Sequence, residues 1–319
     1  RWQFRYDNAL VDGLRTATGQ KLEGVGIREC LLKLKDDFYS AKYAGLACGI
    51  KNSGVGNGMP DFSDVKIEVK SADHIILHHG WTEMGQGVHT MAIQTLCGET
   101  GISPDIIEVI VDTEAGIPTG MTTSSRGTVL VCNAIISAAK AFREDLQTRS
   151  LGDLIGKTYK GGWICDWTTK PGADVEEPVT HYSYGYAAQL CILNDDGNIE
   201  KFIAVHDAGK IMNPTLFEGQ IEGAVHMGIG YALTEELEMK DGFLKSDRLR
   251  DCGVLRAKDT PEIIVRGVEI KDPVGPYGAK GLGEIGLVPT AAAIANALCR
   301  YDSIRRYRLP MKRKNRSTK

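Results

Sequence analysis

The strongest chemical pattern in the sequence is Gly85-Gln86-Gly87. It follows a run that alternates like a strand, residues 65–77, and precedes apolar residues with helical spacing from Val88 onward. The two glycines permit unusual backbone angles and let a ligand approach closely. The amides at a helix start attract anions such as phosphate, and the side chain of Gln86 adds donors and an acceptor. The pattern therefore indicates an anion-binding loop or an ordinary tight turn, and spacing alone favours the turn.

A second stretch, residues 116–127, is rich in hydroxyl groups and leads into an alanine-rich run predicted to be a helix over 128–146. One hydroxyl is enough to cap a helix N-terminus, and this loop offers Thr122, Ser124 and Ser125. The surplus of hydroxyls indicates a second site for an anion, with ordinary capping as the alternative.

Glu284 is a third candidate, because it stands alone among glycines just before Pro289, where another alanine-rich helix is predicted to begin. A carboxylate in this position could be the partner of the helix dipole. It could instead be a catalytic base held in an apolar niche with a raised pKa. The residues alone leave both roles open.

The elements that must position these residues form a repeated pattern. Two strands, a glycine-bearing loop, a helix with a glutamine near its start, and a further strand occur twice, about 130 residues apart. Gln86 and Gln220 take comparable places in the two copies. The expected strands are 42–50, 65–70, 73–79, 106–112, 181–193, 198–206 and 231–239; the other expected helices are 24–39, one from Val88, 215–230 and one from Pro289.

This repeat predicts an α+β fold with two related two-layer α/β lobes and a cleft between them. We place the first lobe at residues 1–160 and the second at 161–319, ending in a basic tail over 312–319. Hairpins, such as the one across Asn194–Gly197, distinguish this fold from a single doubly wound parallel sheet.

Composition excludes several classes of protein. With 38 basic and 41 acidic residues in 319, the net charge of −3 gives no general attraction to nucleic acid or membranes. No apolar run approaches membrane-spanning length, and no signal peptide is expected. The eight cysteines lack any Cys-x-x-Cys pair, so zinc-ribbon and usual iron–sulfur spacings are excluded and reduced thiols in the cytoplasm are expected. The first residue is Arg1, so we expect a piece of a longer or processed polypeptide.

Three stretches carry a distinctive pattern together: Thr82-Glu-Met-Gly-Gln-Gly-Val-His-Thr90, Gln220-Ile-Glu-Gly-Ala224 and Lys280-Gly-Leu-Gly-Glu-Ile-Gly286. In this order and spacing they resemble the xanthine dehydrogenase / aldehyde oxidase family. The resemblance runs from about Gly45 to Arg308 and covers the C-terminal half of that family's molybdopterin-binding portion. Thr119–Ser125 is similar to a fourth cofactor-contacting loop, and the bacterial selenium-dependent purine hydroxylases look closest.

The resemblance implies a role for each candidate residue. Gly85, Gln86 and Gly87 would hold the pterin and its phosphate. A second group would hold the pterin and any nucleotide extension, such as that of a cytosine dinucleotide: Met121, Thr122, Thr123, Ser124, Ser125 and Gln220. Glu284 would be the base that deprotonates a molybdenum-bound hydroxide, which attacks an electron-poor carbon. The pterin dithiolene would hold the metal, so no metal ligand is expected from this chain.

The implied activity is hydroxylation of an N-heterocycle, in the first place a purine such as xanthine or hypoxanthine, with water as the oxygen source. The alternatives are a nicotinate-type or aldehyde oxidoreductase of the same family, or a non-catalytic cofactor-binding or assembly module. The family's iron–sulfur and FAD portions, and the first half of its molybdenum portion, are expected on missing chain or partner subunits of an oligomer. Lys51-Asn52-Ser53 stands where animal xanthine oxidases have a substrate-stacking Phe, which weakens the purine assignment.

Overall fold

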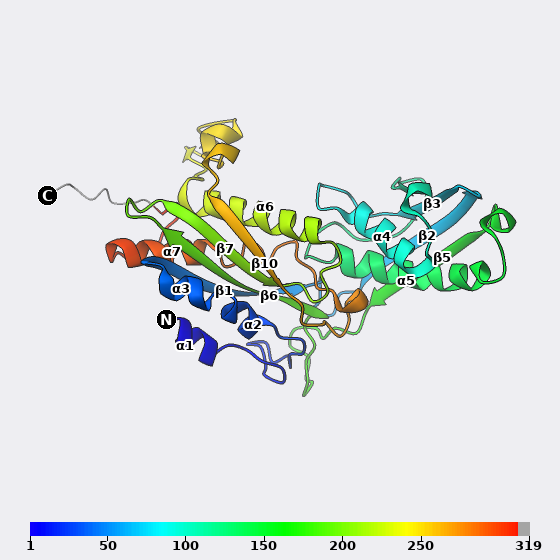
Figure 1. Ribbon diagram of the computed structural model, residues 1–319, viewed down its shortest axis with the longest axis horizontal. Coiled ribbons are helices and arrows are strands. Elements are labelled where there is room, and N and C mark those ends of the chain that lie inside the picture. The colour runs from blue at the N-terminus through cyan, green and yellow to red at the C-terminus, as the bar shows by residue number, and fades with distance from the viewer. Residues whose placement is uncertain (312–319) are drawn as a thin grey trace.

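Two lobes, each built on a four-stranded sheet, lie side by side along the long axis of the molecule (Figure 1). The structure is a computed structural model and describes residues 1–311; the predicted basic tail, 312–319, lies outside the described residues. The two sheets and the helices packed on them confirm the predicted α+β class.

The first lobe has the strand order β4-β3-β2-β5, with helices α4 and α5 packed on one face. Its elements are β2 (Asp61–Ser71), β3 (His74–His79), α4 (Val88–Thr100), β4 (Ile107–Ile110), α5 (Gly127–Leu146) and β5 (Thr158–Cys165). β2 and β3 form an antiparallel hairpin, and β4 pairs with β3 in parallel. The strict alternation of buried and half-exposed residues along β2 shows why one sheet face takes the helices and the other stays polar.

The second lobe has the order β1-β6-β7-β10, with α6 and α7 on one face. Its elements are β1 (Tyr43–Ser53), β6 (Ser183–Leu193), β7 (Ile199–Asp207), α6 (Pro214–Leu233), β10 (Glu262–Val268) and α7 (Thr290–Asp302). Three N-terminal helices lie on the other side: α1 (Trp2–Asp7), α2 (Ile27–Leu32) and α3 (Lys35–Ser40). α1 and α2 contribute to a second core on that face, so β6 is buried along most of its length.

The two lobes share one topology. In each, an antiparallel hairpin leads through a helix to a strand parallel with the hairpin's second strand, and a second helix follows. The fourth strand, β5 or β1, pairs antiparallel with the hairpin's first strand. The predicted internal repeat is therefore present in the fold.

In both lobes, an equivalent close contact between a strand glycine and the second helix positions that helix on the sheet. A Cβ on Gly161 of β5 would lie 2.2 Å from the backbone nitrogen of Ala138 in α5, and a Cβ on Gly45 of β1 would lie 2.1 Å from that of Ala297 in α7. Only glycine leaves room for helix and strand backbones this close. The contact fixes the position of α5, whose N-terminus faces the candidate site described below.

Two sequence-based expectations about elements were wrong. The helix expected over 24–39 is two short helices, α2 and α3, separated after Leu32. The strand expected over 231–239 does not exist as such, because α6 continues to Leu233 with Ala232 still buried against the core. The repeat's last strand is instead β10, reached after an insertion, 234–261, that carries the two-residue strands β8 (Met239–Lys240) and β9 (Phe243–Leu244).

The stretch 151–167, for which no strand was predicted, contains β5. The short 3-10 helices of the described chain are η1 (Pro104–Ile106), η2 (Leu151–Leu154), η3 (Leu249–Cys252), η4 (Ala257–Asp259) and η5 (Pro276–Gly278).

Sheet membership does not follow the boundary proposed at residue 160, since β1 lies in the second sheet and all of β5 lies in the first. Within residues 1–311, none of the helices is both long and apolar enough to cross a membrane.

Candidate functional site

A cavity of about 360 Å³ opens where loops of the two lobes meet. The first lobe contributes the start of α4 and residues 122–128; the second contributes 208, 210–213, the start of α6 and 279–284. The structure thus brings together most of the residues singled out from the sequence. Those that line the cavity are Gln86, Thr122, Thr123, Ser124, Ser125, Gln220 and Glu284. Gly85, Gly87 and Met121 are neighbours of lining residues in the same loops.

The glycine loop before α4 holds its own anion. The carboxylate of Glu83 accepts hydrogen bonds from the backbone N–H groups of Gly85 (2.8 Å), Gly87 (2.9 Å) and His89 (3.2 Å). Gly85 and Gly87 have φ values of 102° and 82°, which only glycine adopts without strain. The anion that helix-start amides attract is therefore supplied here by the chain itself, and the loop amides predicted to bind a phosphate are occupied by Glu83.

The side chain of Gln86 also bonds within this loop. Its Oε1 accepts from the backbone N–H of Met84 at 2.6 Å, and its Nε2 donates to the carbonyl of Thr82 at 2.8 Å. The hydroxyl of Thr122 donates to the same Thr82 carbonyl at 3.3 Å. Gln86 thus fixes the shape of the loop at the cavity wall and links it to the hydroxyl-rich loop.

Replacing Glu83 with Gln should weaken the start of α4. Burial opposes ionisation of Glu83, but the N–H groups of Gly87, His89 and Gly85 outweigh it and lower the pKa of this carboxyl below its usual value. Because the folded pKa is depressed, the stabilisation is present above the unfolded pKa and is lost as pH falls through the folded one. We expect a loss of about 1 kcal/mol at neutral pH, typical of a helix cap, and a smaller difference from the native protein in acid. Thermal unfolding at neutral pH and at a pH below the folded pKa checks this; an equal loss at both would contradict it.

The start of α5 is different, because no side chain caps it. Arg126, Gly127 and Thr128 line the cavity at this end of the helix. Ser124 and Ser125 take left-handed backbone angles, φ 53° and 51°, which are costly for residues other than glycine and recur at functional sites. The surplus hydroxyls of this loop therefore do not serve as helix caps, and the uncapped, positively polarised helix end faces the cavity.

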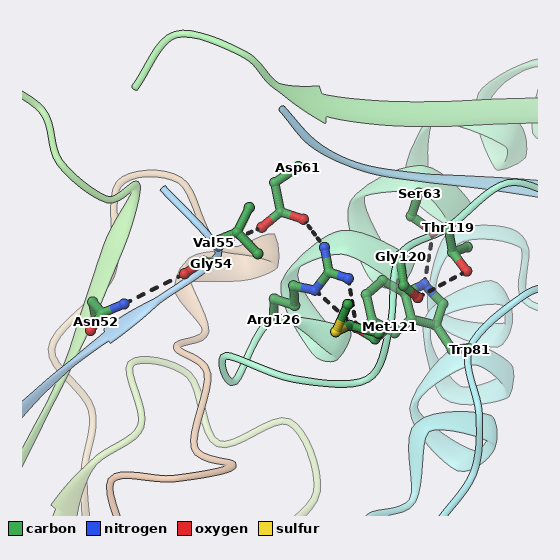
Figure 2. Close-up of polar contacts among 10 residues, drawn as sticks. All are labelled: Asn52, Gly54, Val55, Asp61, Ser63, Trp81, Thr119, Gly120, Met121 and Arg126. Carbon is green, nitrogen blue, oxygen red and sulfur yellow. Dashed lines mark hydrogen bonds and ion pairs between the residues drawn. The ribbon is translucent and has the colours of Figure 1, made fainter. Parts of the chain in front are cut away.

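A buried ion pair holds the hydroxyl-rich loop against the first lobe. The guanidinium of Arg126 pairs with Asp61 of β2 (Figure 2). These two side chains are 5% and 1% exposed. The Arg126 Nε donates to the carbonyl of Met121 at 3.1 Å, and the guanidinium lies 5.1 Å from the ring centre of Trp81. Trp81 in turn donates to Ser63 at 2.9 Å. These contacts fix both ends of residues 121–126 to the sheet.

Glu284 approaches this loop from the second lobe. Its backbone N–H donates to the hydroxyl of Ser125 at 3.0 Å, and that hydroxyl donates to the Glu284 Oε2 at 3.1 Å. The same Oε2 lies 2.8 Å from the Nζ of Lys51 at the end of β1. The side chain of Glu284 is 44% exposed, so the carboxylate is ion-paired and open to the cavity, and the apolar niche considered from the sequence is absent around it.

The loop that carries Glu284 is anchored on both sides. Before it, Lys280 forms a fully buried ion pair with Asp207 at the end of β7. Burial raises the pKa of Asp207, and the charge of Lys280 counteracts that rise. After it, the carbonyl of Gly286 accepts from the Gln189 Nε2 at 2.6 Å. Gln189 also contacts His206, whose pKa burial lowers to about 3, so this imidazole is neutral and structural.

Close backbone packing joins the two loops. A Cβ on Gly281 would lie 1.8 Å from the carbonyl oxygen of Ser125 and 2.7 Å from the hydroxyl of Ser53. The Gln220 Nε2 donates to the carbonyl of Gly283 at 3.1 Å, which ties α6 to the same turn. Gly281 therefore serves a close approach between the lobes, whereas Gly286 lets the turn pack on α6 of its own lobe, where a Cβ would lie 2.5 Å from that of Ala224.

Sequence reasoning missed the buried pairs Asp61–Arg126 and Asp207–Lys280, and it did not connect Lys51 with Glu284. The only signals for them were charged residues placed at strand ends and beside glycines. Lys210 and Asn213, which also line the cavity, gave no signal beyond their place in a loop. Among residues 1–311, no group of three or more His, Cys, Asp or Glu side chains is arranged to hold a metal ion.

Comparison with known proteins now identifies the class. The family model described as molybdopterin cofactor-binding domain matches residues 35–151 and 151–261. The chain is 27% identical over 299 residues to a probable xanthine dehydrogenase subunit of Bacillus subtilis, covering 83% of this chain and 40% of that protein. It is 30% identical over 332 residues to the gamma subunit of the 6-hydroxypseudooxynicotine dehydrogenase complex of Paenarthrobacter nicotinovorans, covering 92% and 41%.

Among solved structures, the aldehyde oxidoreductase of Desulfovibrio gigas is similar with a TM-score of 0.85 and 25% identity, over 97% of this chain and 37% of that one. The chain belongs to the molybdopterin cofactor-binding domain family of xanthine dehydrogenases and aldehyde oxidoreductases, which confirms the resemblance seen in the sequence. It spans about two fifths of the length of these relatives.

Proposed function

We propose that this chain forms the catalytic C-terminal part of a molybdenum hydroxylase, which hydroxylates an electron-poor carbon of an N-heterocycle with water as the oxygen source. The observation that carries the proposal is the convergence of Glu284 and the uncapped start of α5 on one cavity. Its relatives are named as subunits or parts of oxidoreductases. The non-catalytic alternative gives no reason for an exposed carboxylate fixed by Ser125 at this cavity.

The residues present fit a phosphate-bearing pterin cofactor. The uncapped N-terminus of α5 and the hydroxyls of Thr123 and Ser124 offer hydrogen-bond donors toward the cavity, and the Thr122 hydroxyl, which donates to the Thr82 carbonyl, lines it as an acceptor. Gln86 and Gln220 line the same space and would contact the pterin or its nucleotide extension, as in a cytosine dinucleotide. When bound, the molybdenum cofactor supplies the redox chemistry by accepting two electrons from the substrate.

The chain supplies proton transfer and orientation. Glu284 is the carboxylate that we assign as general base, because it lines the cavity and is exposed to it. Ser125 holds the carboxylate in place through two hydrogen bonds, one to the backbone and one to the side chain. The anchors at Lys280 and Gly286 keep the turn rigid, so the carboxylate is positioned before substrate arrives.

The rest of the machinery lies beyond this chain. We propose that the first half of the molybdenum portion, the iron–sulfur clusters and FAD are provided by further polypeptide or by partner subunits of an oligomer in the cytoplasm. Purines such as hypoxanthine and xanthine are one candidate substrate class, following the names of several relatives. A nicotinate-type substrate is the second candidate, favoured by Lys51 beside Glu284.

A substrate panel tests the proposed function. The complete, metal-loaded enzyme should oxidise at least one of hypoxanthine, xanthine and nicotinate, and should incorporate oxygen from ¹⁸O-labelled water into the product. Benzaldehyde serves as the probe for an aldehyde oxidoreductase. Full molybdenum content without turnover of any of the four would contradict the catalytic role and favour a cofactor-binding or assembly module.

A further inference from the structure

Lys51 is the one cation that the described part of the chain pairs directly with Glu284. Its Nζ lies 2.8 Å from Oε2 and also donates to the carbonyl of Asn52 at 2.9 Å. Lys51 and Ser53 are two residues apart on β1 and so point to the same side of the sheet. Ser53 lies under Gly281, which places Lys51 beneath the turn that carries Glu284.

Lys51 is partly accessible beside the cavity, although it is not one of the residues that line it. Its side chain is 25% exposed, and its cross-strand partner on β6 is Gly185, over which the Gly281 carbonyl and Ile285 of the Glu284 turn pack at 3.4 Å from a Cβ position. Burial, and then the charge of Lys51, lower the pKa of the neighbouring His181. His181 is therefore mostly neutral at pH 7, so it does not bring a second positive charge to this place.

The ion pair conflicts with the role of Glu284 as a base. A carboxylate oxygen that accepts a charge-assisted bond from an ammonium group is less free to accept a proton from a reacting group. A substrate with its own anionic group would give Lys51 a new partner and would release Glu284 at the moment of binding. A neutral heterocycle would leave the ion pair in place.

On the basis of the proposed function, we propose that Lys51 determines specificity by binding an anionic group, in the first place a ring carboxylate, of an N-heteroaromatic substrate. The ammonium is in direct contact with the base, so one small aromatic ring seated at Glu284 could present its carboxylate to Lys51. The preferred substrate is then a heteroaromatic acid of the nicotinate type, rather than its uncharged amide.

The matched pair nicotinate and nicotinamide tests this on the complete, molybdenum-loaded enzyme. They differ in one charge and are nearly the same in shape. A charge-assisted hydrogen bond is lost with the amide, so kcat/KM should be roughly ten- to a hundredfold higher for nicotinate. If the wild-type enzyme oxidised nicotinamide and nicotinate with equal kcat/KM, or oxidised only neutral purines, the role of Lys51 would be overturned. The proposed function would remain intact.

Variants sharpen the result. Lys51→Met should bring the ratio of kcat/KM for nicotinate to kcat/KM for nicotinamide close to one, mainly by raising KM for nicotinate. Lys51→Arg should keep most of the wild-type ratio. Lys66→Met is the matched control, because Lys66 is also a strand lysine with a carboxylate partner, Glu68 at 3.6 Å, and is 24% exposed. Each variant is compared at equal molybdenum content. An unchanged ratio in Lys51→Met would overturn the proposal, and the competitive inhibition constant of a non-reacting pyridine carboxylate gives the same comparison without turnover.

The two proposals fail in different ways. If wild-type enzyme with full molybdenum oxidises neither nicotinate nor nicotinamide, and no purine or aldehyde, the proposed function itself is wrong. The role assigned to Lys51 is then wrong as well. If it oxidises one of them but shows no charge preference that depends on Lys51, only the further inference is wrong.

Discussion

Replacing Glu284 with Gln in the complete enzyme is expected to lower turnover by roughly 10²–10⁴, the usual contribution of a general base. Gln keeps the shape of the side chain and can still accept from Ser125, but it cannot take up a proton at neutral pH. Because Glu284 lies in a turn anchored at Lys280 and Gly286, the variant should fold and bind cofactor normally. Steady-state turnover and molybdenum content are measured on the same preparation.

Glu222→Gln is the control for this variant. Glu222 is an exposed carboxylate of α6, two residues from Gln220, and it is not part of the cavity lining within the described chain. Its replacement should leave turnover near the wild-type value. A Glu284→Gln enzyme with full molybdenum and near-normal turnover would remove Glu284 from the mechanism and leave it as a partner of the helix dipole, worth a few tenths to about 1 kcal/mol of stability.

Asp61→Asn should produce the largest loss of stability. It leaves the guanidinium of Arg126 buried without a counter-charge, which typically costs about 3–5 kcal/mol. The hydroxyl-rich loop would lose its anchor to β2, so cofactor content should fall together with the unfolding temperature. Calorimetric unfolding and metal analysis of the same sample measure both effects.

The double variant Asp61→Asn/Arg126→Met separates charge burial from simple loss of a contact. The double variant has no buried guanidinium without a counter-charge, so its stability should be higher than that of Asp61→Asn. The recovery should be partial, because the contacts of Arg126 with Met121 and Trp81 are lost. Arg143→Met is the surface control: its ion pair with Glu99 is half exposed at the arginine, and its loss should cost no more than about 1 kcal/mol. A milder effect for Asp61→Asn than for Arg143→Met would contradict the anchoring role.

Local patterns in the sequence predicted much of the fold. Glycines at 85 and 87, and the hairpin turn at 194–197, were recognisable because each has a specific backbone requirement. The internal repeat was visible because strands and helices differ in their apolar period. The strand β10 was missed because an insertion of irregular structure precedes it, and residues 231–233 were assigned to a strand although they complete α6.

The candidate site was predictable in its members but not in its contacts. Gln86, Ser124 and Glu284 were identified from their types and neighbours. The sequence could not show that Glu83 fills the amides of the glycine loop, because that depends on the direction of one side chain. It could not pair β1 with β6 or bring Lys51 to Glu284 either, since both are long-range contacts made by the sheet.

The position of the metal tests the central claim most directly. In a crystal structure of the complete enzyme, an anomalous difference map collected at the molybdenum edge locates the metal independently of any assumed cofactor. We expect a single molybdenum peak in the cavity bounded by Gln86, Ser124 and Glu284, with the pterin phosphate at the start of α5. A molybdenum peak outside this cavity, or one from which the carboxylate of Glu284 is shielded by other side chains, would contradict the account.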